Sequence, residues 1–201
     1  AWVLRGRALG ELRRWKAAMS DLNQAVKVAP RFALANAWRG RAKQLRGDFA
    51  GACLDFQAAA RKEAASSWAV DERGTVRFQR KSVNKPGQTG QAYLRRLAIP
   101  SAWIWVWKAE AEFMRGRFRR AEADCDKALE IHKQDADALV WRGAARIELK
   151  RCEAALNDLD RAVELKPGYA RALLFRGHCH ERAGRLAEGR DDYKLAQRCD
   201  D

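Results

Sequence analysis

The stretch LRGRA at residues 4–8 recurs along the chain as WRGRA at 38–42, WKAEA at 107–111, WRGAA at 141–145 and FRGHC at 175–179. Successive copies of its central small residue are separated by 34, 69, 34 and 34 residues. A period of 34 residues predicts a stack of antiparallel helix pairs. Because each unit buries its apolar face against its neighbours, we expect a solenoid rather than a domain built around one central core.

Other positions repeat in the same frame when the small residue of each stretch is numbered 8. Position 20 is small in every unit, and its residues are Ala18, Ala52, Ala121, Ala155 and Gly189. Position 27 is Ala in all five units, and larger apolar residues fill most of positions 17 and 24. The small residues allow two antiparallel helices to approach closely. Glycine at position 15, as in Gly47, Gly116 and Gly184, predicts the end of the first helix.

This frame resembles the tetratricopeptide repeat family over five units, at residues 1–32, 33–66, 102–135, 136–169 and 170–201. The resemblance implies an all-α, right-handed superhelical solenoid of antiparallel helix pairs. The expected organisation is two repeat units in residues 1–66, a basic insertion or degenerate repeat in 67–101, and three repeat units in 102–201. The resemblance also implies a protein-interaction scaffold or adaptor that binds a protein or peptide partner.

The residues between the second and third units break the period. Pro86 and Gly87 fall where a second helix would carry its small residues, and a helix interior does not accept that pair. A short hairpin at 68–70 and 75–78, an exposed loop at 84–90 and a short helix at 91–98 are expected instead, with Ser101 capping the next helix. The basic residues singled out in this segment are Arg73, Arg77, Arg80, Lys81 and Lys85.

Charges recur in the frame as well. Position 7 is basic and position 23 is acidic in every unit, which predicts ion pairs within a unit or across to the next one. The residues of this set are Arg5, Arg39, Lys108, Arg142 and Arg176 at position 7, and Asp21, Asp55, Asp124, Asp158 and Asp192 at position 23.

Position 6 carries a series of large apolar side chains, Leu4, Trp38, Trp107, Trp141 and Phe175. In the resembled family this position is commonly polar and lines a concave groove, so the series predicts an aromatic-lined groove for a peptide or partner helix. The alternative is that these rings pack against the next unit. The other expected groove residues are Arg7, Arg41, Glu110, Phe113, Met114, Arg171 and His178.

A well-known use of the resembled fold is the binding of acidic chaperone tails through a carboxylate clamp of Lys, Asn and Arg residues. At the clamp positions the last three units offer Val106, Glu110, Trp141, Arg171 and Phe175, and only Arg171 fits. Chaperone C-terminal tails are therefore not expected as partners.

The net charge of +14 is unevenly distributed. Residues 1–63 carry 13 basic and 5 acidic residues, residues 64–101 carry 7 and 2, and residues 102–201 carry 20 and 19. A basic N-terminal half favours acidic partners and makes binding of nucleic acid or another polyanion the second hypothesis. Because the chain starts in mid-pattern without Met, the third hypothesis is a regulatory repeat region of a larger enzyme or co-chaperone.

No residue set in the sequence points to catalysis, a cofactor or a metal. His178, Cys179 and His180 are neighbours on an expected helix, where alternate residues point apart, and zinc needs more ligands at compatible spacing. The five Cys residues contain no C-x-x-C pair, which favours free thiols in a reducing, cytoplasmic compartment. No apolar run is long enough to span a membrane.

Overall fold

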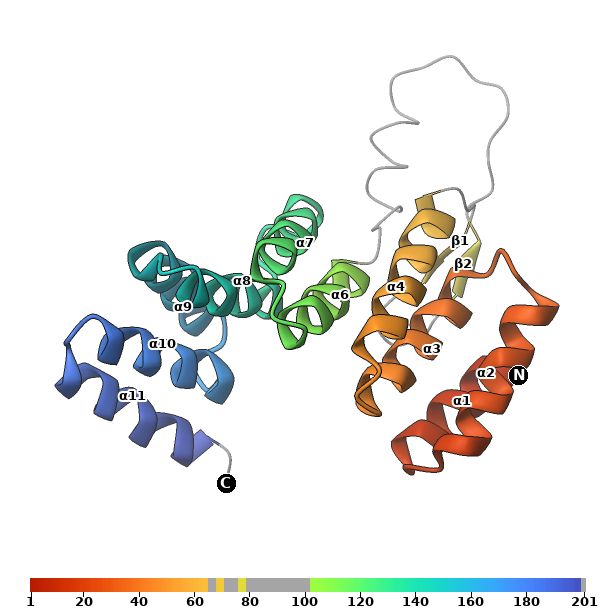
Figure 1. Cartoon of the computed structure of the whole chain (residues 1–201), viewed down its shortest axis with the longest axis horizontal. Coiled ribbons are helices and arrows are strands. Elements are labelled where there is room, and N and C mark those ends of the chain that lie inside the picture. The colour runs from red at the N-terminus through yellow and green to blue at the C-terminus, as the bar shows by residue number, and fades with distance from the viewer. Residues whose placement is uncertain (65–67, 71–75, 79–101, 200–201) are drawn as a thin grey trace, which may run out of the picture. The chain divides into compact units, whose positions relative to one another are not determined.

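A computed structural model describes residues 1–64, 68–70, 76–78 and 102–199 of the chain (Figure 1). These residues form ten helices and one two-stranded sheet. The chain divides into two compact units, Ala1–Ala111 and Glu112–Asp201. The boundary between the units falls within helix α6 (Ala102–Met114).

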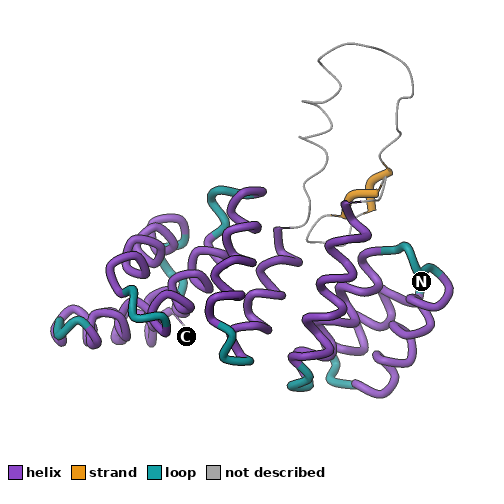
Figure 2. The backbone as a smooth tube through the Cα atoms, turned by 45° about the horizontal axis from the view of Figure 1, so that its top comes forward, coloured by secondary structure: helices purple, strands orange, loops and turns teal. Residues whose placement is uncertain are grey.

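Both units consist of helices joined in pairs by short turns, as Figure 2 shows. Unit 1 contains α1 (Trp2–Glu11), α2 (Trp15–Val28), α3 (Ala33–Leu45), α4 (Phe49–Ala64) and most of α6. Unit 2 contains α7 (Phe118–Ile131), α8 (Ala136–Glu148), α9 (Cys152–Leu165), α10 (Ala170–Arg182) and α11 (Leu186–Cys199). The helices confirm the predicted all-α fold of antiparallel pairs.

The two helices of a pair touch at the small residue of position 8. A Cβ atom added to Gly143 would lie 2.8 Å from Leu159 Cγ and 3.3 Å from the backbone oxygen of Ala155. The equivalent contacts are as close at Gly6, Gly40 and Gly177. Because real Cβ atoms rarely approach other atoms this closely, glycine sets the distance between the helices, and the position 24 side chain fills the space that it leaves.

The turn between the helices of a pair always includes a residue with positive φ. Three of these residues are glycines, Gly47, Gly116 and Gly184, with φ between 71° and 85°. This agrees with the prediction that they end the first helix. The other two are Arg13 and Lys150, at φ of 56° and 61°. A side chain in this region is held at some cost in energy, and the repeat frame alone gives no sign that non-glycine residues adopt it.

Helix α6 packs directly on the second helix pair. Ile104 and Ala111 of α6 share a buried cluster with Ala37, Ala52 and Phe56 of α3 and α4. The first helix of the third repeat thus follows the second repeat in the stack, although the sequence period is broken between them.

The predicted hairpin is present as β1 (Trp68–Val70) and β2 (Val76–Phe78). The strands pair antiparallel, with Ala69 opposite Arg77. The predicted loop at 84–90, the helix at 91–98 and the Ser101 cap lie outside the described residues. The same holds for the basic residues Arg73, Arg80, Lys81 and Lys85.

The close helix crossing predicts opposite effects for two glycine substitutions. Gly143→Ala should lower the free energy of unfolding by about 1–3 kcal/mol, because the new methyl group overpacks the crossing. Gly10 also lies in a helix, but an added Cβ would meet only Trp15, at 3.8 Å. Gly10→Ala should therefore raise the free energy of unfolding by up to about 1 kcal/mol through helix propensity. Urea denaturation measures both, and equal effects would contradict the crossing model.

Candidate functional site

Four position 7 arginines are bound to the position 23 aspartates of their own units. In Arg142, Nε and Nη2 donate to the two carboxylate oxygens of Asp158, at 2.9 and 2.6 Å. Arg39 binds Asp55 in the same bidentate way, at 2.9 and 2.6 Å. The other two pairs are Arg5 with Asp21 and Arg176 with Asp192. The four aspartates are buried, so each carboxylate depends on its arginine for compensation. The predicted pair of Lys108 and Asp124 stays a prediction.

Three of these arginines also reach back to the preceding repeat. Arg142 donates from Nη1 to Asp126 at 2.9 Å, and Arg176 donates from Nη1 to Asp160 at 3.0 Å. In unit 1, Arg39 donates from Nη1 to Asn23 at 3.3 Å. The guanidinium therefore joins the second helices of two consecutive repeats. Sequence reasoning left open whether the position 7 and position 23 residues pair within or between units. The four described pairs lie within units, and the bonds to the preceding repeat go to position 25 instead.

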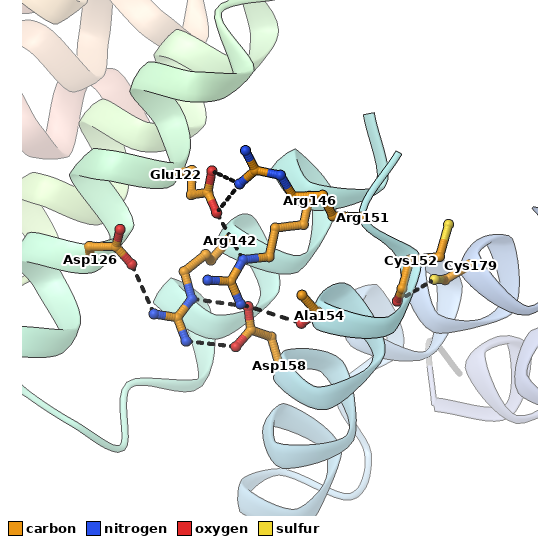
Figure 3. A network of polar contacts seen from close by, with 9 residues as sticks. All are labelled: Glu122, Asp126, Arg142, Arg146, Arg151, Cys152, Ala154, Asp158 and Cys179. Carbon is orange, nitrogen blue, oxygen red and sulfur yellow. Dashed lines mark hydrogen bonds and ion pairs between the residues drawn. The ribbon is translucent and has the colours of Figure 1, made fainter. Parts of the chain in front are cut away.

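Arg142 lies in a larger polar network of unit 2 (Figure 3). Arg146 donates to Asp158 at 2.7 Å and to Glu122 at 2.9 Å, and Glu122 also accepts from Arg151. Burial lowers the pKa of Arg142, but hydrogen bonds to Asp158 and Asp126 outweigh it and raise the pKa above its usual value. Every charge in this network has a partner of opposite sign, which identifies it as structural.

The first helices of unit 1 present a second and different set of side chains. Trp38 and Trp107 meet edge to face, with ring centroids 5.3 Å apart. The guanidinium of Arg7 lies 4.7 Å from the Trp38 ring, and that of Arg41 lies 5.1 Å from the Trp107 ring. Both tryptophans remain partly exposed. These four residues, with Glu110, are called the aromatic face of unit 1.

Both arginines of the aromatic face are neutralised within the unit. Arg7 donates to Glu11 at 2.9 Å, and Arg41 donates to Glu110 at 2.9 Å. Arg41 also donates to the side-chain oxygen of Gln44, whose Nε2 is buried without a partner in the described part of the chain. Counted together with Glu11, the aromatic face therefore has no net charge. Its chemistry is that of partly exposed rings under guanidinium groups.

Unit 2 contains a separate aromatic cluster formed by Phe113, Phe118, Trp141 and Phe175. Phe113 lies 5.4 Å from Trp141 and 6.2 Å from Phe175 between ring centroids. Trp141 is only 6% exposed, because these rings and Arg171, 5.1 Å above it, cover the indole. The expectation that Trp141 lines an open groove is therefore wrong, since this ring packs against neighbouring rings instead.

The remaining predicted residues are more scattered. Leu4 and Met114 are exposed, at 60% and 54%, and His178 is partly exposed. Leu4 lines an apolar cavity of about 240 Å³ with Trp2, Val28 and Phe32. For Arg77 only the backbone in β2 is described. Sequence reasoning missed Gln44 and Leu45, which lie three and four residues beyond Arg41 on the same helix, although this helical spacing could have indicated them.

No group of three or more His, Cys, Asp or Glu side chains in the described residues could hold a metal ion. Among the helices that the structure describes, none combines the length and apolar character that crossing a membrane requires.

Comparisons with known proteins agree with this architecture. Two tetratricopeptide repeat family models match the chain, at residues 1–32 and 142–201. The chain is similar to the solved structure of MamA, with a TM-score of 0.68 and 16% identity over 97% of this chain and 94% of that chain. No curated protein matches.

Two further solved structures are similar. YrrB, described as a TPR protein with an unusual peptide-binding site, has a TM-score of 0.64 and 13% identity over 98% of this chain and 84% of that one. TTC0263, a thermophilic TPR protein of Thermus thermophilus, has a TM-score of 0.62 and 17% identity over 97% of this chain and 88% of that one. At these identities the likeness shows the fold.

The polar network predicts that two nearby aspartates, Asp158 and Asp160, contribute differently to the stability of the fold. Asp158 is buried and binds two arginines, so Asp158→Asn should lower the free energy of unfolding by about 2–4 kcal/mol. Asp160 is exposed and makes a single bond to Arg176, so Asp160→Asn should lower it by less than about 1 kcal/mol. Urea denaturation at neutral pH compares the two, and a larger loss for Asp160→Asn would refute the assignment of the network.

Proposed function

Since the chain belongs to the tetratricopeptide repeat family, we propose that it is a scaffold that binds a segment of a protein partner on the aromatic face of unit 1. The observation that carries the proposal is the pair of partly exposed tryptophans, Trp38 and Trp107, each under an arginine. Aromatic and arginine side chains of this kind dominate the binding energy of protein interfaces.

Apolar side chains extend the aromatic face along two helices. Leu4, Arg7 and Glu11 lie on one side of α1, at helical spacings of three and four residues. On α3, Trp38, Arg41 and Leu45 repeat the arrangement. Leu4 and Leu45 are 60% and 54% exposed, so a partner can cover them without unfolding the unit.

The charge balance of this face favours a particular partner chemistry. Because Glu11 and Glu110 neutralise Arg7 and Arg41, an acidic tail gains little from these arginines. An apolar or aromatic anchor gains more, since it can stack on the rings and cover both leucines. The proposed occupant is therefore a peptide segment with apolar anchors, rather than a chaperone tail. The similar protein YrrB, described as having a peptide-binding site, supports this kind of partner.

The proposal predicts which exposed leucines matter for binding. The probe is a peptide selected on the purified chain from a phage-displayed random library. Leu4→Ser and Leu45→Ser should each weaken its binding by about tenfold, which corresponds to about 1.4 kcal/mol. Leu54→Ser is the matched control, because Leu54 is 68% exposed but lies on the second helix α4. Fluorescence polarisation measures the affinities.

An equal loss in all three variants would indicate a general effect on folding, and circular dichroism would detect it. If Leu54→Ser weakened binding while Leu4→Ser and Leu45→Ser did not, the partner would bind elsewhere and the proposal would fail.

A second candidate function is binding of a polyanion such as RNA, and it rests on the charges of unit 1. Every described carboxylate of this unit is engaged: Glu11, Asp21, Asp55 and Glu110 in ion pairs, and Asp48 by the backbone N–H of Gly51. In contrast, eight basic side chains form no ion pair within the described part of unit 1. They are Arg13, Arg14, Lys16, Lys27, Arg31, Arg46, Arg61 and Lys62. These cations remain available to phosphate groups.

The polyanion candidate predicts steep dependence of binding on salt. With poly(U) RNA as the probe, Arg14→Gln combined with Lys16→Gln should reduce the slope of log affinity against log salt by about 1–2. Arg119→Gln combined with Arg120→Gln, at exposed positions of α7 in unit 2, is the control and should leave the slope unchanged. A flat salt response of the unmodified chain would exclude this candidate.

A further inference from the structure

Two cysteines of unit 2 lie against each other where α9 meets α10. Cys152 is the first residue of α9, and Cys179 lies in α10. The thiol of Cys179 donates to the backbone oxygen of Cys152 at 3.2 Å, and both sulfurs are free (Figure 3). Neither residue belongs to the polar network or to the aromatic cluster described above.

The repeat frame makes this pair unusual among the units of the chain. Cys152 occupies position 17 and Cys179 occupies position 10 of the next unit. At the corresponding pairs the other units carry a large aromatic residue and an alanine, namely Trp15 with Ala42, Phe49 with Ala111, and Phe118 with Ala145. In unit 1, Phe49 packs against the buried cluster that contains Ala111. The repeat thus brings position 17 of one unit close to position 10 of the next, and in the fourth and fifth units both residues are cysteine.

The contact between the two residues places them close to the range of a disulfide. The Cα–C and C=O bonds together span at most about 2.8 Å. A sulfur that is 3.2 Å from the Cys152 oxygen therefore lies within about 6 Å of the Cys152 Cα atom. Disulfides join residues whose Cα atoms are about 4.4–6.8 Å apart. The Cys179 sulfur lies about 2.8 Å from its own Cα atom, so the two Cα atoms are at most about 9 Å apart. Rotation of the two side chains, with a small approach of α9 and α10 where the distance exceeds the disulfide range, is therefore expected to bring the sulfurs into bonding contact.

The two thiols differ in access. Cys152 is partly exposed at the start of its helix, whereas Cys179 is fully buried. Burial raises the pKa of Cys179 to about 12, and the adjacent Cys152 adds to the rise. An oxidant from solution therefore meets Cys152 first, and Cys179 reacts only as the second partner.

We propose that Cys152 and Cys179 form a reversible disulfide that cross-links the fourth and fifth repeats, with a small-molecule disulfide such as glutathione disulfide as the oxidant. The Cys152 thiolate attacks one sulfur of glutathione disulfide, which breaks its S–S bond and releases one glutathione thiolate. The Cys179 thiolate then attacks the Cys152 sulfur of the mixed disulfide and releases the second glutathione. Two protein thiols are oxidised, one glutathione disulfide is reduced to two glutathione thiols, and the two cysteine protons pass to them.

The cross-link has a mechanical consequence for unit 2. It fixes α10, which carries Arg171 and Phe175, against α9. Because it closes a loop between residues 152 and 179, it also restricts the unfolded chain. The oxidised protein should therefore melt at a temperature higher by roughly 5–10 °C than the reduced protein.

The test equilibrates the purified chain in glutathione redox buffers and maps disulfides by mass spectrometry after alkylation of free thiols. The expected product is the Cys152–Cys179 disulfide, with Cys125 remaining a free thiol. Cys179→Ala places the residue that the other four units carry at this position, so its fold should persist. This variant should stop at the mixed disulfide on Cys152 and lose the rise in melting temperature. Cys199→Ser is the control and should behave like the unmodified chain.

Two results would overturn the proposal. One is glutathione attached to Cys152 of the unmodified chain with no second step, under buffers in which the exposed Cys199 is fully modified. The other is a disulfide that joins Cys152 to Cys199, which would show that access rather than the packing of α9 on α10 determines the pairing.

Discussion

The distance between the two helices of each pair is the constraint on which the rest of the structure depends. In four of the pairs the position 8 residue is a glycine that brings the first helix into contact with a backbone oxygen of the second helix. These glycines are Gly6, Gly40, Gly143 and Gly177. At that separation the position 24 side chain fills the remaining space, and the position 7 arginine reaches the carboxylate sixteen residues further on. A wider crossing would lose this packing and the bidentate ion pair together.

Neighbouring positions of one helix carry the structural ion pairs and the proposed binding face. Residues at positions 6 and 7 differ in direction by about 100° on an α-helix, so Trp38 and Arg39 face different surroundings. Arg39 points to the second helices, where its planar fork of donors serves two repeats at once. Trp38 lies among the first helices beside Trp107 and Arg7. Arginines in this chain therefore have two roles: some hold repeats together, and others cover aromatic rings.

The period of 34 residues was enough to predict the helix pairs, the three glycine turns and the four Arg–Asp pairs, because these features recur in most units and depend on local spacing. Features that depend on one particular neighbour were not predictable. Trp141 is buried because Phe113 and Phe175 meet over it, and the frame assigns it the same position as the partly exposed Trp107. The positive φ of the turn residues Arg13 and Lys150 was not predictable either. The turn imposes that backbone conformation on whatever residue is present. The packing of α6 on the second helix pair was not predictable either, because the 34-residue period is broken before α6.

The central claim is that a partner segment binds to the aromatic face of unit 1, and the indole N–H signals of the tryptophans test it most directly. The experiment is a ¹H–¹⁵N NMR titration of the labelled chain with a library-selected peptide. The account predicts that the signals of Trp38 and Trp107 shift on binding, while the signal of Trp15, on the second helix α2, does not. A peptide that binds and shifts Trp15 but leaves Trp38 and Trp107 unchanged would contradict the account.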